Sequence, residues 1–357
     1  MILPAKSRGQ VYPFPGRAAR LLSDFFHYFY SCKGWLHETF FSLFLAAACA
    51  LLAGCAAPAG TASTAGKARP AGSAQAISIV DDLGRTVHVE APPQRVAALI
   101  GSFADVWCLA GGADTLAATA NDAWTSFDGL PLDGVANLGA AKEISLEALI
   151  EAEPDFVIAS CNTAADMELL PTFEAMGIPA AYFEVSTFEQ YLSMLDRCTL
   201  LTGDRAAYKQ NGTDVQAQVD EAIARADGSA PRVLYIRVSG SGCRVKNSRD
   251  NVLGEMLAAL GCKNIADREG SLLENLSMEI ILAEDPDFIF LVYQSADPSV
   301  AEAVADEMLR ADPAWASLRA VQEGRCYVMD QQLYNLKPNA RWGEAYENLA
   351  DILYPAA

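Results

Sequence analysis

Two segments of the chain, separated by 132 residues, share one succession of polar and apolar positions. The first covers residues 145–158 and the second covers residues 277–290, and they align without a gap. Each begins with a serine, whose hydroxyl can accept a hydrogen bond from a free amide at the start of a helix. A Pro-Asp pair then ends the helical pattern, and an apolar run follows that is typical of a buried parallel strand. The duplication therefore predicts two similar lobes.

Strand and helix patterns alternate on both sides of the duplicated segments. Strands are expected at residues 95–100, 116–119, 155–160, 180–183, 233–237, 288–292 and 326–329. Helices are expected at residues 104–110, 187–201, 253–260, 300–309 and 339–353. Residues 77–80 and 86–89 flank turn-forming residues and read as a hairpin, and residues 101–103 read as a turn. This alternation predicts an α/β fold with parallel sheets that are covered by helices.

One helical pattern is much longer than the others and lies between the two halves. It runs from about residue 204 to residue 225, and Gly212 weakens it near the middle. We therefore expect an N-terminal lobe at residues 77–200, a connecting backbone helix within residues 201–230, and a C-terminal lobe at residues 231–357.

The N-terminal region has the layout of a secretory signal peptide. Lys33 precedes an apolar run at residues 40–53, which is too short to span a bilayer comfortably. The run ends in Leu-Ala-Gly-Cys at residues 52–55, which resembles the bacterial lipobox. That resemblance implies that residues 1–54 are removed, that Cys55 is lipidated, and that residues 55–76, rich in small residues, form a flexible tether.

Composition and charge exclude several classes of function. The net charge of −19 argues against nucleic acid as a partner, because nucleic-acid-binding proteins present basic surfaces. After Cys55 the only histidine is His88, which lies on the expected hairpin, so the chain lacks the several histidines of a directly bound zinc or manganese ion. We therefore expect no metal site and no resident cofactor. A haem whose iron is bound by a tyrosine remains an open alternative.

The motifs of common enzymes are missing from the sequence. The chain has no GxSxG, no P-loop, and no GxGxxG after a strand. The six cysteines after Cys55 form no CxxC pair, and both free thiols and disulfides remain open for them. The sequence therefore favours binding over catalysis.

Three groups of residues resemble the class III substrate-binding proteins of ABC importers, which serve iron–siderophores, haem and cobalamin. The first is the opening at residues 81–87 and 92–96, and the second is Ser145-Leu146-Glu147 with Glu153-Pro154-Asp155. The third is the C-terminal stretch at residues 337–345 with residues 353–355. The resemblance covers residues 77–357 and implies two α/β lobes that are joined by one stiff helix.

The resemblance also implies a docking partner. In this family one glutamate on each lobe pairs with arginines of a dimeric permease that works with an ATPase, and the matching residues are Glu147 and Glu279. An alternative is that each glutamate only stabilises its helix, because a negative charge in the first turn interacts favourably with the helix dipole.

The ligand is expected between the lobes, where loops follow the carboxyl ends of the strands. The loops are residues 101–103, 121–124, 161–162, 237–244, 293–294 and 334–341. Aromatic side chains there can stack on a flat chelate, and arginines can bind its carboxylates. The candidate contacts are Ser102, Phe103, Asn121, Trp124, Asn162, Arg237, Arg244, Tyr293, Tyr334 and Arg341.

We therefore expect an extracytoplasmic protein, anchored to the cell membrane by lipid, that captures a metal chelate and delivers it to an ABC permease. The chelate is an iron–siderophore, a haem or a cobalamin. Two alternatives remain open, namely an enzyme that handles haem or a metal chelate on the same scaffold, and a lipoprotein without a transport role.

Overall fold

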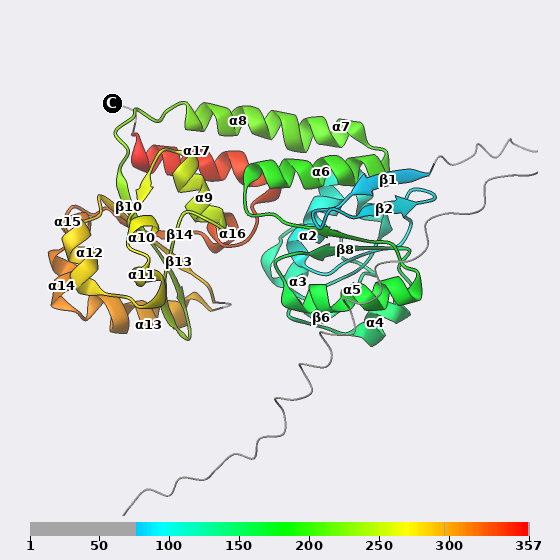
Figure 1. Ribbon diagram of the computed structural model, residues 1–357, viewed down its shortest axis with the longest axis horizontal. Helices are drawn as coiled ribbons and strands as arrows, with labels where there is room; N and C mark the ends of the chain where they lie inside the picture. The colour runs from blue at the N-terminus through cyan, green and yellow to red at the C-terminus, as the bar shows by residue number, and fades with distance from the viewer. Residues whose placement is uncertain (1–75, 296, 356–357) are drawn as a thin grey trace, which may run out of the picture. The chain divides into compact units, whose positions relative to one another are not determined.

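The computed structural model describes residues 76–295 and 297–355. The predicted signal peptide, Cys55 and nearly all of the tether lie outside these residues. The described residues form two α/β lobes, each built on a mainly parallel sheet (Figure 1). The predicted fold class is therefore confirmed.

The N-terminal lobe contains a parallel sheet in the order β5-β4-β3-β8-β9. Every residue of β8 and β9 is buried, because helices cover both faces of the sheet. The strands are β3 Val96–Ala98, β4 Leu116–Thr119, β5 Ala136–Asn137, β8 Phe156–Ser160 and β9 Ala180–Phe183. The helices are α2 Gly101–Trp107, α3 Asp122–Ser126, α4 Leu146–Glu151, α5 Ala164–Met176 and α6 Phe188–Thr202.

Two small antiparallel pairs and two short helical turns complete this lobe. The predicted hairpin is present as β1 Ile77–Val80 with β2 Thr86–Val89. A second pair joins β6 Gly139–Ala140 to β7 Glu143–Ile144. The turns η1 Cys108–Gly112 and η2 Ala113–Thr115 follow α2.

The C-terminal lobe contains a sheet in the order β11-β10-β13-β14, and β12 pairs with β10. All pairs are parallel except β10 with β11. The strands are β10 Arg232–Ser239, β11 Gly242–Lys246, β12 Lys263–Asn264, β13 Phe288–Tyr293 and β14 Cys326–Met329. The helical elements are α9 Val252–Ala259, α10 Ile265–Arg268, α11 Ser271–Glu274, α12 Met278–Glu284, α13 Pro298–Ala305, η4 Asp306–Arg310, α14 Pro313–Ser317, α15 Arg319–Gln322, α16 Gln331–Tyr334, η5 Asn339–Arg341 and α17 Trp342–Leu353.

A long helix connects the lobes, as the sequence predicts. It consists of α7 Arg205–Tyr208, a π-helical turn η3 Lys209–Thr213, and α8 Asp214–Ile223. It packs on α6 near its start and on α17 near its end (Figure 1). Gly212 allows the close approach to α6, because a Cβ there would lie 3.3 Å from the Leu195 side chain. The glycine that weakens the helical pattern in the sequence therefore serves the close packing of this helix against α6.

The duplicated segments adopt the same local structure in both lobes. The Ser145 hydroxyl accepts a hydrogen bond from the Ala148 amide at 3.2 Å, and the Ser277 hydroxyl accepts one from the Ile280 amide at 3.4 Å. The predicted serine caps of α4 and α12 are therefore confirmed.

The turn after each capped helix is fastened to the sheet by one aspartate and one arginine. The Asp155 carboxylate accepts a hydrogen bond from the Arg95 amide at 2.9 Å, and Asp287 accepts one from the Arg232 amide at 2.8 Å. The two arginine side chains donate in return to the last carbonyls of the helices, Arg95 to Ala152 and Arg232 to Glu284. Each helix is thereby fixed to a strand of its sheet, α4 to the start of β3 and α12 to the start of β10.

The expected turn at residues 101–103 is wrong, because α2 begins at Gly101. The residue before it, Ile100, has no side-chain acceptor, and the Asp122 carboxylate from α3 accepts the Gly101 amide instead, at 2.9 and 3.0 Å. A Cβ at position 101 would lie 2.6 Å from the Ala123 amide nitrogen, so only glycine fits there. The cap comes from a distant part of the chain, and local sequence rules therefore missed it.

The expected loop at residues 237–244 is also wrong. These residues form a hairpin between β10 and β11, in which Arg237 lies directly opposite Arg244. Ser239 and Gly242 close the ladder, with Gly242 at a φ of +134°. The glycines and serines that suggest a loop occupy only the tight turn.

We predict that Gly343→Ala destabilises the contact between α17 and α8. An ideal Cβ at position 343 would lie 2.7 Å from the Cβ of Gln218 and closer still to its amide. Overpacking of this kind costs about 1–3 kcal/mol of unfolding free energy, which urea unfolding measures. Gly270→Ala is the matched control, because nothing lies within 4 Å of its Cβ position. Equal stability of the two variants would contradict the tight contact.

Candidate functional site

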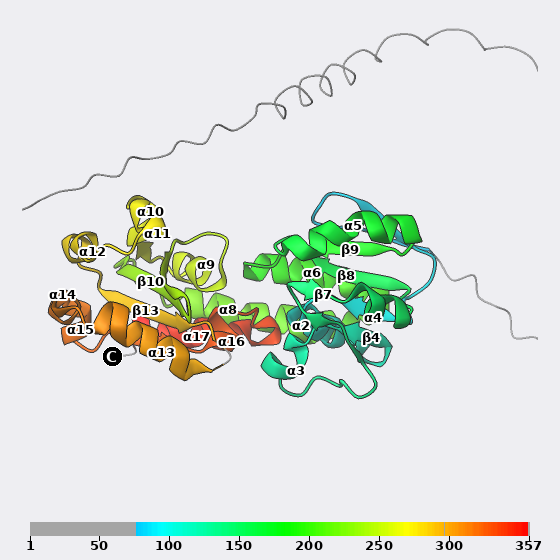
Figure 2. The same ribbon diagram turned by 90° about the horizontal axis from the view of Figure 1, so that it is seen from below.

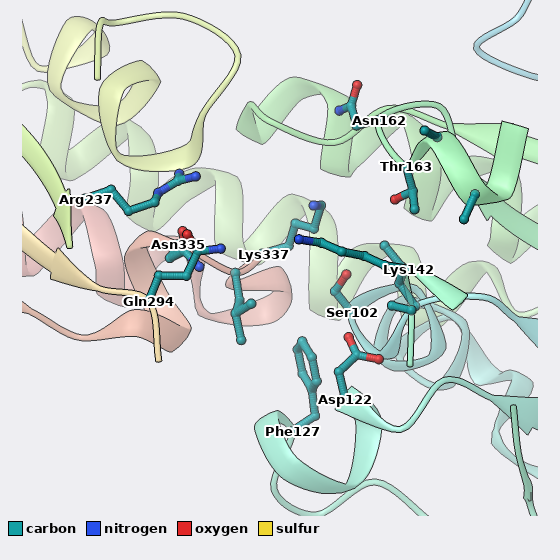
Figure 3. A pocket seen from close by; sticks show the side chains of 15 residues that line it. Ser102, Asp122, Phe127, Lys142, Asn162, Thr163, Arg237, Gln294, Asn335 and Lys337 are labelled. Carbon is teal, nitrogen blue, oxygen red and sulfur yellow. The ribbon is translucent and has the colours of Figure 1, made fainter. Parts of the chain in front are cut away.

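A cavity of about 500 Å³ opens between the two lobes (Figure 3). We call it the interlobe cavity. Its polar lining residues are Ser102, Asp122, Lys142, Asn162 and Thr163 of the N-terminal lobe and Arg237, Gln294, Asn335 and Lys337 of the C-terminal lobe. Its volume falls in the range of small-molecule sites, roughly 300–1,000 Å³.

The lining residues come from chain segments that follow parallel strands. Ser102 lies just after β3, Asp122 after β4 and Asn162 after β8. In the other lobe, Arg237 lies near the end of β10 and Gln294 directly follows β13. The carboxyl edges of two parallel sheets therefore face one cavity, the usual position of ligands in open α/β sheets.

The interlobe cavity is basic, although the chain as a whole is acidic. Lys142, Arg237 and Lys337 line it, and Asp122 is its one acidic residue in the described chain. In Figure 3 the amino groups of Lys142 and Lys337 both extend into the space between the lobes. Because the net charge of the chain is −19, this local reversal of sign favours an anionic ligand.

Asp122 and Lys337 influence one another across the cavity. Burial lowers the pKa of Lys337, the nearby Asp122 carboxylate opposes this shift, and the like charge of Arg237 adds to it. Burial also raises the pKa of Asp122, while its hydrogen bond from the Gly101 amide works in the opposite direction. The Lys337 amino group lies 6.0 Å from the centre of the Phe103 ring, at the limit of cation–π contact.

Arg237 presents a partly unsatisfied guanidinium to the cavity. Its Nη2 donates to the Tyr235 hydroxyl at 3.3 Å, while its buried Nε has no hydrogen-bond partner in the described chain. Arg244 and Lys246 lie beside it on β11. Burial lowers the pKa of Lys246, and the like charges of Arg237 and Arg244 lower it further. This end of β10 and β11 is therefore a concentrated positive region.

Asn339 connects the two lobes beside the cavity. Its side-chain Nδ2 donates to the Ser102 carbonyl at 2.9 Å and to Asp105 Oδ2 at 2.8 Å. Asn339 is fully buried and has a φ of +53°, a conformation that asparagine tolerates better than most residues. Burial raises the pKa of Asp105, and the hydrogen bond from Asn339 opposes the shift. The Asn339 bridge fixes the segment that carries Lys337.

Asp166 lies in the wall behind the cavity, in the first turn of α5. It has no exposed surface, and its Oδ2 accepts a hydrogen bond from the Ser160 amide at 2.7 Å. Its Oδ1 has no partner among the described residues. Burial raises the pKa of Asp166 to about 7, because the charged carboxylate is poorly solvated there.

The structure brings three of the candidate ligand contacts together. Ser102, Asn162 and Arg237 all line the interlobe cavity. Arg341 lies next to it, in a smaller pocket of about 210 Å³, and forms an ion pair with Glu344 at 2.7 Å.

The aromatic candidates lie elsewhere. Phe103 is fully buried, and Trp124 is 41% exposed outside the cavity lining. Tyr293 and Tyr334 are buried, with their hydroxyls bonded to the Arg310 guanidinium and to the Ala345 carbonyl. The rings of Phe103, Tyr293 and Tyr334 pack inside the lobes, because burying them contributes more than leaving them at a polar cavity.

The remaining polar candidates also lie off the cavity lining. Asn121 is exposed at the start of α3, and its amide donates to the Gly139 carbonyl. Arg244 is exposed on β11. Four lining residues were not predicted from the sequence: Lys142 and Phe127 lie outside the expected ligand loops, and Asp122 and Lys337 lie within them. The charges of Lys142, Asp122 and Lys337 were the available signal, and Phe127 offered none.

The structure describes free thiols at all six cysteines after Cys55. Burial raises the pKa of Cys108, Cys198 and Cys262 to about 12, so these thiols are unreactive at neutral pH. No group of three His, Cys, Asp or Glu side chains suitable for a metal ion occurs within residues 76–295 and 297–355. In the same ranges, no helix has the length and apolarity needed to cross a bilayer.

Glu147 and Glu279 occupy equivalent positions in the two lobes. Each is an exposed residue in the first turn of its helix, α4 or α12. Neither forms an ion pair with another described residue. Both carboxylates are therefore accessible to an external partner.

We predict that Asp166 makes stability depend on pH. Because its pKa is raised to about 7 in the folded protein, its contribution is complete below its ordinary value of 3.8 and is lost as the pH rises to 7. The expected slope is at most about 1.4 kcal/mol per pH unit. Urea unfolding from pH 4 to 8 should show this slope reduced in Asp166→Asn and kept in the exposed Asp133→Asn control. Equal slopes in both variants would contradict the assignment.

Comparison with known proteins identifies the family. The model of the periplasmic binding protein family matches residues 96–333. The Fe(3+)-citrate-binding protein YfmC of Bacillus subtilis is 25% identical over 265 residues, which cover 72% of this chain and 79% of YfmC. The Fe(3+) dicitrate-binding periplasmic protein FecB of Escherichia coli is 23% identical over 265 residues, which cover 73% of this chain and 84% of FecB.

Solved structures share the fold. The periplasmic heme-binding protein RhuT from Roseiflexus sp. RS-1, in its apo form, matches with a TM-score of 0.61 and 21% identity. The match covers 73% of this chain and 98% of RhuT. Together with the two lobes and the long helix, these findings confirm the resemblance seen in the sequence. The chain belongs to the periplasmic binding protein family.

Proposed function

We propose that this protein is the substrate-binding component of an ABC importer and that it captures a small anionic metal chelate in the interlobe cavity. The observation that carries the proposal is the charge of the lining. Three cationic side chains, Lys142, Arg237 and Lys337, face one carboxylate, Asp122, which already caps α2. An anionic ligand relieves the repulsion among these cations and gains charge-assisted hydrogen bonds from them.

The lining favours a hydrophilic chelate rich in carboxylates over a large flat ring. Phe127 is the one aromatic residue that lines the interlobe cavity in the described chain. The lining residues also include no tyrosine, histidine, methionine or cysteine that can ligate a haem iron. Within the iron–siderophore, haem and cobalamin classes, this chemistry supports a ferric polycarboxylate. The names of YfmC and FecB agree with a ferric citrate ligand.

The metal enters as part of the ligand. Lysine and arginine bind carboxylates rather than metal ions, and the guanidinium of Arg237 can grip a carboxylate with two parallel hydrogen bonds. Asn162, Gln294 and Asn335 add amide groups for hydroxyl and carboxylate oxygens. The side chains therefore recognise the outer surface of a preformed complex, and the role is transport rather than catalysis.

The remaining parts of the chain fit an anchored importer component. We propose that Cys55 carries the lipid, that residues 56–76 form the tether, and that the protein works outside the cytoplasm at the cell membrane. Glu147 and Glu279 are the proposed contacts with the two halves of the permease. The lobes 77–200 and 231–357 then present one carboxylate each, and the connecting helix keeps them at a set distance.

Substitution of Lys337 tests the ligand class. Lys337→Met should weaken ferric citrate binding about tenfold to a hundredfold, because one charge-assisted hydrogen bond contributes about 1.5–3 kcal/mol. Since burial lowers the pKa of Lys337, wild-type affinity should fall as the pH rises toward its ordinary value of 10.5. Lys337→Arg should keep binding at that pH. Tryptophan fluorescence titration measures each affinity.

The matched control is Lys263→Gln, an exposed lysine of the C-terminal lobe away from the interlobe cavity. It should bind as the wild type does. Wild-type protein that binds haemin or cobalamin tightly and ignores ferric citrate would overturn the proposed ligand class.

Substitution of both docking glutamates tests the transport role. Glu147→Ala combined with Glu279→Ala should leave ligand affinity unchanged, because both residues lie outside the interlobe cavity. Uptake of the bound chelate by cells carrying only this variant should be lost. Iron-55 uptake beside fluorescence titration separates the two effects, and normal uptake would refute the docking proposal.

A further inference from the structure

Each of the two docking helices carries an exposed apolar side chain at the same place. Ile150 in α4 is 47% exposed and Leu282 in α12 is 39% exposed. They lie 132 residues apart, so they are equivalent in the duplicated segments. One exposed leucine needs no explanation, but the same exposure at both copies of one position is a shared feature of the two lobes.

Each exposed apolar residue lies one helical turn after a docking glutamate. Ile150 is three residues after Glu147, and Leu282 is three residues after Glu279. Side chains three apart on a helix are neighbours on the same face, about 5–6 Å apart. We call Glu147 with Ile150, and Glu279 with Leu282, the two rim patches. Figure 2 shows their helices, α4 and α12, on different lobes.

The helices hold both rim patches in the same orientation. Leu149 and Ile281, the equivalent residues that face the core, are 1% and 0% exposed. The serine caps fix the start of each helix, and the arginine contacts to the Ala152 and Glu284 carbonyls fix its end. Because each helix is fixed at both ends, its patch loses little conformational entropy when it binds a partner.

The turn after each helix is also held in the same unusual conformation. Glu153 has a φ of +46° and its equivalent Asp285 has a φ of +38°, a region that side chains other than glycine rarely adopt. Both precede a proline, and strain of this kind persists only where surrounding contacts enforce it. The two lobes thus keep the whole helix-and-turn unit, including its outward face.

We propose that the rim patches are two-part docking sites, in which Ile150 and Leu282 pack against apolar side chains of the permease beside the bonds made by Glu147 and Glu279. The partner is a two-fold symmetric integral membrane protein that presents a basic and an apolar side chain together on each half. The inference rests on the proposed transport function. An exposed ion pair contributes little by itself, and apolar neighbours that exclude water make it stronger.

The chain supplies a matched control pair. Met176 and Met308 are each 43% exposed and also lie 132 residues apart. The residues three positions before them, Phe173 and Ala305, are fully buried, so neither methionine has a glutamate at the docking position. This pair matches the rim residues in exposure and in spacing along the chain, but it lies outside the duplicated segments and has no glutamate three residues earlier.

Photo-crosslinking in intact cells tests the proposal without knowledge of the ligand. Each of positions 147, 150, 279, 282, 176 and 308 of the full-length chain is replaced in turn by p-benzoyl-L-phenylalanine. We expect positions 150 and 282 to crosslink to a polytopic permease subunit identified by mass spectrometry, and positions 176 and 308 to give none.

The outcomes separate this inference from the proposed function. Crosslinks to the permease from positions 147 and 279, without any from 150 and 282, would overturn the two-part site and leave docking intact. Absence of permease crosslinks from all four positions would overturn both. Equal yields from the methionine pair would also overturn the inference.

A second measurement determines how much the apolar contact contributes to binding affinity. Ile150→Gln combined with Leu282→Gln should weaken saturable binding to the source cell's membranes on the order of tenfold. Glutamine is a good helix former, so the fold and ligand affinity should be unchanged. Salt should still weaken the remaining binding, because both carboxylates are present. Met176→Gln combined with Met308→Gln should bind normally, and a loss equal to that of the rim variant would contradict the proposal.

Discussion

The helix from Arg205 to Ile223 is the constraint on which the arrangement of the two lobes depends. It supports the N-terminal lobe through α6 and the C-terminal lobe through α17. A helix resists bending far more than an extended linker does, so the lobes have little freedom to separate. The Asn339 bridge adds a second connection at the edge of the interlobe cavity. We therefore expect ligand capture in such a frame to proceed by small shifts rather than by wide hinge closure.

The positive cavity in an acidic chain follows from this frame. Burial disfavours the charge on Lys337, and the Asp122 carboxylate offsets part of that cost. The same carboxylate caps α2, so its position in the cavity wall is fixed by the hydrogen bonds from the Gly101 amide. One acidic residue therefore orients a helix and supports a partly buried cation, while Lys142 and Arg237 remain available to an anion.

The two lobes hold α4 and α12 by the same contacts, but the residues that line the cavity differ between them. Asp155 with Arg95 and Asp287 with Arg232 repeat the same contacts between the helix, the turn after it and a central strand, β3 or β10. The C-terminal lobe reinforces it with Arg319, which bonds both Asp285 and Asp287. Among the lining residues of the described chain, only Asn162 and Gln294 keep the 132-residue offset, and the charged lining residues of the two lobes do not repeat. In the proposed importer, a symmetric permease would contact two similar outer faces, whereas one ligand would contact two different walls.

Local sequence patterns determined most of the fold and little of the site. The serine caps, the buried strands and the long helix depend on residues close together in the chain, and all were predicted. The start of α2 was missed because its cap, Asp122, is 21 residues away. The tyrosines at positions 293 and 334 were expected at the ligand but lie buried, because only tertiary packing decides which rings the core absorbs. Lys142 and Lys337 meet in one cavity for the same reason: they belong to different lobes, and only the packing of the lobes brings together side chains that no pattern along the chain relates.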